Sequence, residues 1–515
     1  MRGPSSSHCA AALRIGRLAR DLMGGKLTEV LVEFDRQGSL PTTHDTQGSD
    51  MGLFGGLLGW DADDERLPDS AVALRDAGVR LRIETVDAGD PHPNTYRLTL
   101  RNDRECRFLR AISTGGGAIE ILNLDGFEVS LFGDCFETLL WVKENGRELA
   151  GSLRPLLNDA TVLVHEAAGA QLVEVKAGGF VKDTLLASIR GRFELLAETR
   201  LHPVLPVLSR PGTQVPFTTC GEMLQHDAGR NLPLWKLGVE YEMARGDLRE
   251  EEVMARMGDI VRVLRRSIAG GIAGTRYEDR VLGPQSGRFE ALRQAGQLLD
   301  GGMLNRMIGY ITALMEVKSS MGVIVAAPTA GACAALPGAV IAAAEEVGEG
   351  EEAMARALLA GGAIGVFIAT QWTFAAELGG CQAEGGSAAC MAAAALTDLA
   401  GGSLNQSVAA ASLALQNMLG LICDPIANRV EAPCLGKNVM AASNALACAN
   451  MALADYDPLI PLDEVIEAAR QVAGQMPREL RCTALGGLSI TPASQALEQR
   501  LTARKAAACG GCGAG

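Results

Sequence analysis

Three cysteines stand where glycine or proline interrupts the apolar, helix-like sequence of the C-terminal half of the chain. Cys381 follows two glycines, Cys423 precedes an Asp-Pro pair, and Cys434 follows a proline. A helix ends at such a break and a side chain can turn inward, so three thiols from one helical domain can converge on one point. Cys390 and Cys448 lie inside helical runs, where a thiol behaves as a small hydrophobic residue.

The spacing of the three cysteines does not by itself identify their role. Positions 381, 423 and 434 are 42 and then 11 residues apart, which is neither a standard ferredoxin nor a zinc-finger pattern. Structural thiols, an iron–sulfur cluster and zinc therefore remain open, with structural thiols first. A [4Fe–4S] cube takes four thiolates. If the protein supplies three, one iron stays open as a Lewis acid, as in a catalytic zinc site.

The composition excludes several classes of partner. At 515 residues the chain is long enough for two or three domains. Its net charge of −14 repels phosphate backbones and anionic lipids, so we expect neither nucleic acid nor a membrane as a partner. Thirteen cysteines without a secretory signal indicate reduced thiols and a cytoplasmic location. The most apolar segment, 357–380, contains Gln371 and Glu377 and lacks anchors at both ends, which predicts a buried helix.

The sequence pattern of the segments that must position these residues predicts an α+β protein of several domains. Residues 1–123 mix β-rich runs with helical patterns and form an α/β unit. Residues 127–200 predict a small βαββαβ, ACT-like regulatory module, and residues 201–216 a proline-rich linker. Residues 217–500 are mostly helical, and 501–515 form a low-complexity, mobile tail. Within the small module we expect strands at 128–133, 161–167 and 171–177 and helices at 136–157 and 182–197.

Two helix starts can be read directly from the sequence. Ser403 with Gln406 three places later predicts a capping box before an apolar run that ends near Ile422. Thr491 followed by Pro492 predicts another helix with proline at its first position.

Seven short motifs, in order along the chain, are similar to those of the bacterial iron–sulfur L-serine dehydratases. The N-terminal motifs resemble that family's β-domain and the C-terminal motifs its α-domain, joined here in one chain from residue 1 to about 500. The motifs are GPSSSH (3–8), GLLG (56–59), HPNTYR (92–97), STGGGAI (113–119), MGVIVAAPTAGACAALPG (321–338), GGCQAEGGSA (379–388) and NMLGLICDPIANRVEAPCLGKN (417–438).

This resemblance implies an enzyme that converts L-serine to pyruvate and ammonia. It makes Cys381, Cys423 and Cys434 the protein ligands of a [4Fe–4S] cluster whose open iron holds the substrate. An open iron polarises the C–O bond, and a nearby base takes the weakly acidic α-proton. Hydroxyls and free N–H groups of Ser/Gly turns can donate hydrogen bonds to the substrate carboxylate. The candidates are Ser5, Ser6, Ser7, His8, Ser113, Gly115, Gly116, Gly117, Thr329, Ala330 and Gly331.

GPSSSH is also a plausible capped helix start, which is compatible with anion binding because helix N-termini attract anions. His92 and Asn94 match the family's His-Pro-Asn element, and we expect both in the active site, with His92 catalytic. Gln47 stands where the family usually has histidine, and glutamine cannot act as a base. His44, three residues earlier, is the alternative catalytic residue. Asn428 and Arg429 also depart from the family pattern, which leaves the substrate open among β-substituted amino acids such as threonine and cysteine.

The last cysteines offer a fourth ligand for the cluster: Cys482, Cys509 or Cys512 could fold back onto the open iron. We expect a homo-oligomer, a dimer, with a small amino acid as the substrate. Two other readings remain: a pyridoxal phosphate enzyme, for which no lysine stands in a convincing setting, and an amino-acid sensor with a retired catalytic site.

Overall fold

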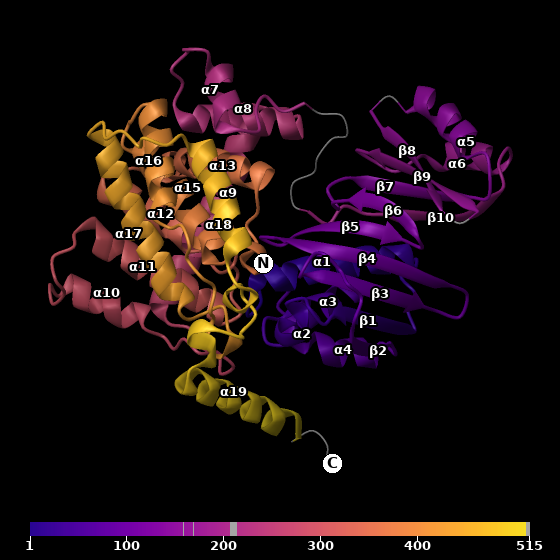
Figure 1. Ribbon diagram of the computed structural model, residues 1–515, viewed down its shortest axis with the longest axis horizontal. Coiled ribbons are helices and arrows are strands. Elements are labelled where there is room, and N and C mark those ends of the chain that lie inside the picture. The colour runs from indigo at the N-terminus through magenta and orange to yellow at the C-terminus, as the bar shows by residue number, and fades with distance from the viewer. Residues whose placement is uncertain (158, 168, 206–213, 511–515) are drawn as a thin grey trace.

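The protein consists of two β-sheets followed by a helical domain (Figure 1). The computed structural model describes residues 1–157, 159–167, 169–205 and 214–510, with side chains for all of these except 505–510. Both sheets lie within residues 29–201, and helices make up the chain from Cys220 onward. This arrangement confirms the α+β class predicted from the sequence.

The larger sheet has six strands in the order β2-β1-β3-β4-β5-β6. β1 and β2 are parallel and the other pairs are antiparallel. Alternate residues of β3, Tyr96, Leu98 and Leu100, are fully buried, as the two-residue period of a strand requires. The elements of this unit are α1 (Ser6–Leu22), β1 (Glu29–Asp35), α2 (Leu40–Thr43), α3 (Ser49–Leu57), α4 (Ser70–Asp76), β2 (Arg80–Val86), β3 (Thr95–Arg101), β4 (Cys106–Gly115), β5 (Ala118–Leu124) and β6 (Phe127–Leu131).

Helix α1 packs between this sheet and α3. Its residues Ala12, Ile15 and Leu18 belong to the same buried core as the strands. On its other side α1 approaches α3 so closely that a Cβ added at Gly52 would lie 1.9 Å from the Cys9 carbonyl oxygen. Glycine is therefore required there, and this tight contact fixes the start of α1, where the GPSSSH motif lies.

The smaller sheet has four strands in the order β10-β7-β9-β8 and carries α5 and α6. The chain order strand-helix-strand-strand-helix-strand is the βαββαβ pattern of ferredoxin-like folds. Its elements are β7 (Phe136–Val142), α5 (Gly146–Leu153), β8 (Thr161–Ala167), β9 (Ala170–Ala177), α6 (Asp183–Arg190) and β10 (Leu195–Leu201).

Three elements of this region differ from the sequence prediction. The strand expected at 128–133 as the first of the module is β6, which pairs with β5 in the larger sheet. Residues 136–142, expected as helix, form strand β7, because Phe, Thr, Trp and Val favour strands and Asn145 at φ +66° breaks the chain before α5. The helix expected to continue to 197 ends at Arg190, and β10 follows.

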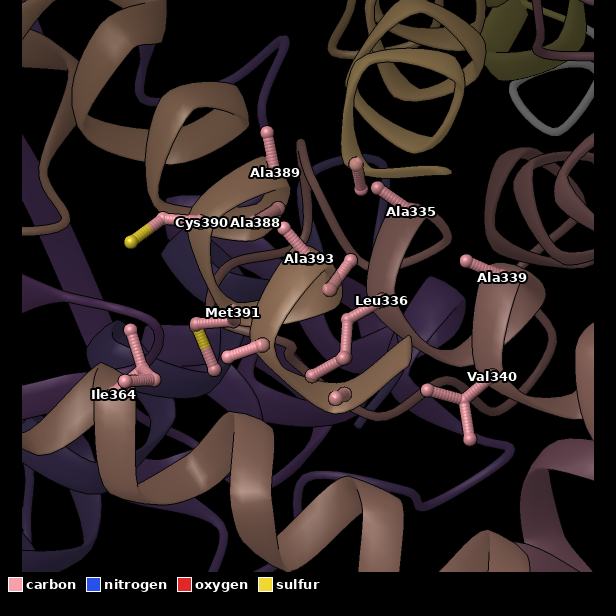
Figure 2. Packing of buried hydrophobic residues seen from close by; sticks show 14 of the residues in the cluster. Ala335, Leu336, Ala339, Val340, Ile364, Ala388, Ala389, Cys390, Met391 and Ala393 are labelled. Atoms are coloured by element: carbon pink, nitrogen blue, oxygen red, sulfur yellow. The ribbon is translucent and has the colours of Figure 1, made fainter. Parts of the chain in front are cut away.

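The helical domain is organised around α15, which is buried along most of its length. Figure 2 shows its Met391 and Ala393 between Leu336 of α12 and Ile364 of α13. Small side chains let these helices approach closely, and Cys390 and Cys448 are fully buried, as expected. The helices are α7 (Cys220–Asp227), α8 (Leu234–Gly246), α9 (Glu250–Ala273), α10 (Ser286–Gln294), α11 (Met303–Ser319), α12 (Ala335–Glu346), α13 (Glu351–Gln371), α14 (Ala376–Gly379), α15 (Ser387–Leu399), α16 (Leu404–Gln416), α17 (Cys434–Leu453), α18 (Leu462–Gln475) and α19 (Pro492–Gly510).

Helix α13 is long and apolar enough to cross a membrane, and 67% of its apolar window is buried inside the protein. It is a core helix, as predicted for this segment. The capping box of Ser403 and Gln406 is present at the start of α16, and Pro492 opens α19. α19 continues to Gly510, past residue 500 where the tail was expected. Residues 206–213 of the expected linker and 511–515 of the expected tail lie outside the described residues.

Both ends of the chain tie the N-terminal unit to the helical domain. The N-terminal amine donates to the Ile324 carbonyl oxygen at 3.0 Å. From the other end, Arg478 donates to the Gln37 carbonyl oxygen at 3.1 Å, and the Thr42 hydroxyl donates to the Thr483 carbonyl oxygen at 3.2 Å. Residues far apart in the sequence are thereby held at one junction.

Candidate active site and metal centre

Cys381 lies at a sharp break between two helices. Gly380, at φ +67°, ends α14, and the chain then enters one turn of π-helix, Gln382–Gly386, before α15. A Cβ at Gly380 would lie 2.8 Å from the Leu421 carbonyl oxygen, so glycine is required for this approach. Single π-turns occur often at functional sites because they turn side chains away from the regular helix face.

Cys423 is held beside Cys482 by backbone hydrogen bonds. The Cys423 N–H donates to the Leu480 carbonyl oxygen at 2.9 Å, and the Cys482 N–H donates to the Cys423 carbonyl oxygen at 3.0 Å. Cys381, Cys423 and Cys482 share one small buried cluster. Cys482 was one of three cysteines considered as a fourth ligand, and that role remains a prediction.

Cys434 is the first residue of α17. One helical turn later, the Asn438 amide donates to the carbonyl oxygens of Cys434 and Gly331, at 2.8 and 2.7 Å. Its side-chain oxygen accepts from the N–H groups of Ala334 and Ala335. Asn438 therefore fixes the 329–331 segment against the start of α17.

The sulfurs of Cys381 and Cys423 and a carboxylate oxygen of Glu384 all lie within 4.8 Å of one another. Cys434 is outside this set, and burial, followed by the charge of Cys381, raises the pKa of its thiol well above the usual range. Hydrogen bonds with Cys381 and Cys482, and burial, raise the pKa of Cys423 in the same direction. The fit to a metal cofactor rests on the convergence of these donors, since a bound cation holds cysteines as thiolates.

A partly buried cation, Lys437, lies next to these thiols. The Lys437 ammonium is 3.6 Å from the Cys381 sulfur and donates to Asp424 at 2.8 Å and to the Ile422 carbonyl oxygen at 2.7 Å. A positive charge at this distance stabilises a thiolate. It suits a metal centre whose thiolate ligands leave it with excess negative charge.

A small cavity adjoins the thiols and is lined by both parts of the protein. The N-terminal unit contributes hydroxyl, imidazole and amide groups, and the helical domain contributes one hydroxyl and two carboxylates. The polar side chains and glycines that line it are Ser7, His8, Asn94, Ser113, Gly115, Gly116, Thr329, Glu377 and Glu384.

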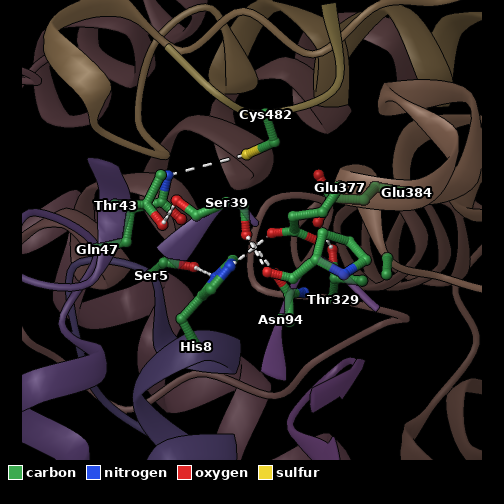
Figure 3. Close-up of polar contacts among 12 residues, drawn as sticks. Ser5, His8, Ser39, Thr43, Gln47, Asn94, Thr329, Glu377, Glu384 and Cys482 are labelled. Carbon is green, nitrogen blue, oxygen red and sulfur yellow. Dashed lines mark hydrogen bonds and ion pairs between the residues drawn. The ribbon is translucent and has the colours of Figure 1, made fainter. Parts of the chain in front are cut away.

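A buried ion pair crosses the junction at this cavity (Figure 3). His8 Nε2 lies 2.6 Å from Glu377 Oε1, and the Ser5 hydroxyl lies 2.7 Å from His8 Nδ1. The Asn94 side chain also hydrogen-bonds Glu377. Burial opposes charge on both partners, but the imidazolium lowers the pKa of Glu377 to about 2 and the carboxylate raises the pKa of His8. The pair is therefore charged at neutral pH and holds the start of α1 over the cavity.

Glu384 stands between the cavity and the thiols. The Thr329 hydroxyl donates to Glu384 Oε1 at 2.6 Å. Burial, with the nearby charge of Glu377, raises the pKa of Glu384 to about 7. A carboxyl group with this pKa can accept or donate a proton near neutral pH.

The three-glycine turn between β4 and β5 inserts into the helical domain. Gly115 and Gly116 have φ values of +102° and +62°, and added Cβ atoms would lie 3.0 Å from the Ala375 nitrogen and 2.8 Å from the Pro328 carbonyl oxygen. Glycine is therefore needed for both conformation and space. Both glycines line the cavity, and their role in binding an anion remains a prediction.

Several residues predicted from the sequence as part of the site are not among the residues that line the cavity. The Ser6 hydroxyl donates to the Gly3 carbonyl oxygen, and the Gly117 carbonyl oxygen accepts from Arg14. His92 Nδ1 accepts from the Asn94 N–H at 3.1 Å. Ser5, Ser6, Gly117, Ala330, Gly331, His92 and His44 are in this group.

His44 has partners of its own within the N-terminal unit. Its Nδ1 lies 2.8 Å from both carboxylate oxygens of Asp50, and its ring centroid is 5.1 Å from that of Phe34. Gln47, at the position where a histidine was expected, is fully buried and points toward the thiols. Its amide nitrogen is 3.2 Å from Asn428 Oδ1 and 3.8 Å from the Cys482 sulfur.

Sequence reasoning missed Glu377, Glu384 and Lys437. In the sequence, Glu377 was evidence that segment 357–380 does not span a membrane. A carboxylate inside an apolar run also indicates a buried polar site. Glu384 follows Cys381 by three residues, and its proximity to the thiols was a readable signal. Of the cysteines near the C-terminus, Cys512 lies outside the described residues, as does the side chain of Cys509.

Comparisons with known proteins agree on one family. The family model described as serine dehydratase alpha chain matches residues 229–489. The probable L-serine dehydratase alpha chain of Bacillus subtilis (strain 168) is 35% identical over 285 residues, which cover 55% of this chain and 95% of that relative. The beta chain from the same organism is 41% identical over 134 residues, 26% of this chain and 60% of the relative. The L-serine dehydratase of Streptomyces coelicolor is 28% identical over 502 residues, 95% of this chain and 96% of the relative.

Proposed function

The chain belongs to the serine dehydratase family, and we propose that it is a lyase that converts L-serine to pyruvate and ammonia. The observation that carries this proposal is the position of two buried thiols and Glu384, within 4.8 Å of one another, beside a polar cavity. Full-length relatives that share this domain order bear the name L-serine dehydratase.

We propose that Cys381, Cys423 and Cys434 hold a [4Fe–4S] cluster. Three thiols that come from separate helix breaks, with Lys437 beside them, support this ligand set. When bound, a cube with one iron free of protein ligands supplies a Lewis acid that polarises the C–O bond of a substrate hydroxyl.

The substrate carboxylate is assigned to the N-terminal side of the cavity. Ser7 and Ser113 provide hydroxyl donors, and the turn at Gly115 and Gly116 provides backbone N–H groups. The imidazolium of His8, kept charged by Glu377, adds a positive charge at the same place. These donors orient the α-carbon toward Glu384 and Thr329.

Glu384 is proposed to accept the α-proton. It lines the cavity and also lies next to the thiols, whereas His92 and His44 lie outside the lining residues. Loss of the proton and of hydroxide gives aminoacrylate and one water. The aminoacrylate tautomerises to the imine, and hydrolysis of the imine consumes one water and yields pyruvate and ammonia. His92 is assigned to positioning Asn94, through their 3.1 Å hydrogen bond.

The wider organisation follows from the same proposal. The unit built on strands β1 to β6, residues 1–131, and the helical residues 217–500 are assigned as the serine dehydratase β-type and α-type domains, with the ACT-like module of β7 to β10, residues 136–201, between them. A homodimer and a cytoplasmic location complete the assignment.

Anaerobic reconstitution with iron and sulfide, followed by a panel of amino acids scored for ammonia release, tests the proposal. We expect turnover of L-serine and about four irons per chain. Cys423→Ala is expected to lose both iron and activity, and Cys390→Ala, which removes a core thiol from α15, to keep both. If the protein turns over threonine or cysteine in preference to L-serine, that amino acid replaces L-serine as the proposed substrate. If the reconstituted protein binds an amino acid saturably but does not turn it over, the proposed function becomes that of an amino-acid sensor.

A further inference from the structure

Lys318 is a fully buried lysine whose ammonium forms no ion pair with any described residue. It lies in the last turn of α11, its residue exposure is 0%, and its Nζ has no hydrogen-bond partner among the residues that the structure describes. A buried ammonium without a counter-charge is strongly unfavourable. A lysine in this position therefore points to an anionic group that occupies the adjacent space in the working protein.

The surroundings of Lys318 identify the place of that anion. Burial lowers the pKa of Lys318, and the nearby charges of Glu431, Cys434, Cys333 and Glu384 oppose this shift. Glu431 already accepts the N–H groups of Val281 and Leu282, each at 2.9 Å. Cys434 is a proposed cluster ligand, so Lys318 lies on the Cys434 side of the metal centre. It is absent from the residues that line the substrate cavity, which makes a substrate carboxylate the less suitable partner.

The second lysine of the centre provides a contrast. Lys437 lies 3.6 Å from the Cys381 sulfur but is paired with Asp424 at 2.8 Å, so its charge is largely neutralised within the protein. Among the described residues, no carboxylate forms a hydrogen bond with Lys318 Nζ. A cube with three thiolate ligands is an anion in its oxidised form, and one-electron reduction adds a further negative charge.

On the basis of the cluster proposed above, we propose that Lys318 is the buried counter-charge of the iron–sulfur cluster, and that it raises the reduction potential of the cluster and helps to retain it. The ammonium and N–H donors near the sulfurs stabilise the reduced, more negative form most, because net charge and hydrogen bonds to sulfur set these potentials. Lys318 is a positioning and tuning residue that does not touch the substrate.

The proposal predicts effects of opposite sign in the two forms of the protein. Lys318→Met keeps the length of the side chain and removes its charge. In the metal-free protein it removes an uncompensated buried amine, so the thermal unfolding temperature is expected to rise. In the reconstituted protein it removes the counter-charge. Reduction of the cluster is then expected to become at least about tenfold less favourable, which is 59 mV for one electron.

The test uses the full chain as wild type, Lys318→Met and Lys318→Arg, each reconstituted anaerobically. The midpoint potential is measured by EPR during reductive titration, and cluster retention by iron release to a chelator. We expect a lower potential and faster iron loss in Lys318→Met, and recovery toward wild type in Lys318→Arg. The unfolding temperature of each metal-free protein is measured in parallel.

Three results would overturn the proposal. Equal potentials and iron loss in wild type and Lys318→Met would overturn it and leave the lyase intact. If metal-free Lys318→Met unfolds at a lower temperature than wild type, or fails to fold, Lys318 stabilises the fold itself and the proposal is wrong. A wild type that takes up no cluster would overturn both this proposal and the proposed cofactor.

Discussion

Replacing Glu377 by glutamine tests whether the buried His8–Glu377 pair holds the N-terminal motif over the active site. The substitution keeps the size of the side chain and its ability to accept a hydrogen bond, and it removes the negative charge. Because the folded-state pKa of Glu377 is depressed, its contribution to stability is fully present above its ordinary pKa of 4.5 and is lost only as the pH falls through about 2. At neutral pH the variant should therefore lose the whole contribution.

The magnitude follows from the same values. A fall in the pKa of Glu377 from 4.5 to about 2 corresponds to about 3 kcal/mol at 1.36 kcal/mol per pKa unit. Both side chains are at most 12% exposed, so solvent screening reduces this figure little. If local opening of the start of α1 breaks this pair, removing the pair should increase the opening equilibrium, and with it the amide exchange rate, by roughly a hundredfold.

Amide hydrogen exchange, read by mass spectrometry on peptides from the first turns of α1, measures this opening. Glu352→Gln is the matched control, because Glu352 pairs with Arg356 on the surface with its side chain 71% exposed. Such pairs contribute little, so the control should leave exchange in α1 unchanged. If Glu377→Gln also leaves it unchanged, the pair does not anchor α1 and the proposed role of His8 is wrong.

The remaining predictions concern the base, a close packing contact and the pH dependence of stability. Glu384→Gln should lower kcat by about 10²–10⁴-fold, with unchanged iron content, as shown by pyruvate formation and iron analysis on the same samples. Gly52→Ala should strongly lower the unfolding temperature, because its Cβ would lie 1.9 Å from the Cys9 carbonyl oxygen. Gly362→Ala, with nothing within 4 Å, should stabilise by about 0.5–1 kcal/mol. Burial and Glu174 raise the pKa of Glu137 to about 8, so the folded state holds the extra proton and stability should fall as pH rises from about 4.5 to 8. Glu137→Gln should unfold at a higher temperature than wild type at about pH 9, and this difference should shrink as the pH falls and vanish near pH 4.5.

Local patterns in the sequence were sufficient for many elements of the fold. The capping box at Ser403 and the proline at position 492 marked real helix starts, because the determinants of a helix end lie within four residues. Strand β7 was predicted as helix, since a seven-residue segment with Glu137 and Thr138 among apolar residues is too short for its periodicity to separate the two. The pairing of β6 with β5 depends on tertiary contacts, which local pattern does not encode.

The candidate site shows the same division. Cys381 and Cys423 were predictable as ligand candidates because glycine and proline mark the breaks where they stand. The proximity of Gln47 to Cys482 joins residues 435 positions apart and could not be read from either segment. Glu377 stands inside an apolar run, where its partner His8 lies 369 positions away. The missing information is the long-range packing that brings both ends of the chain to one junction.

Mössbauer spectroscopy of protein reconstituted with isotopically enriched iron tests the central claim most directly, because it resolves each iron of the cluster. If Cys381, Cys423 and Cys434 hold a cube with one open corner, about one quarter of the iron signal should shift when L-serine is added. The same sample should form pyruvate. A cluster whose iron signals all stay unchanged with serine, or a protein that forms pyruvate without any cluster, would contradict the account.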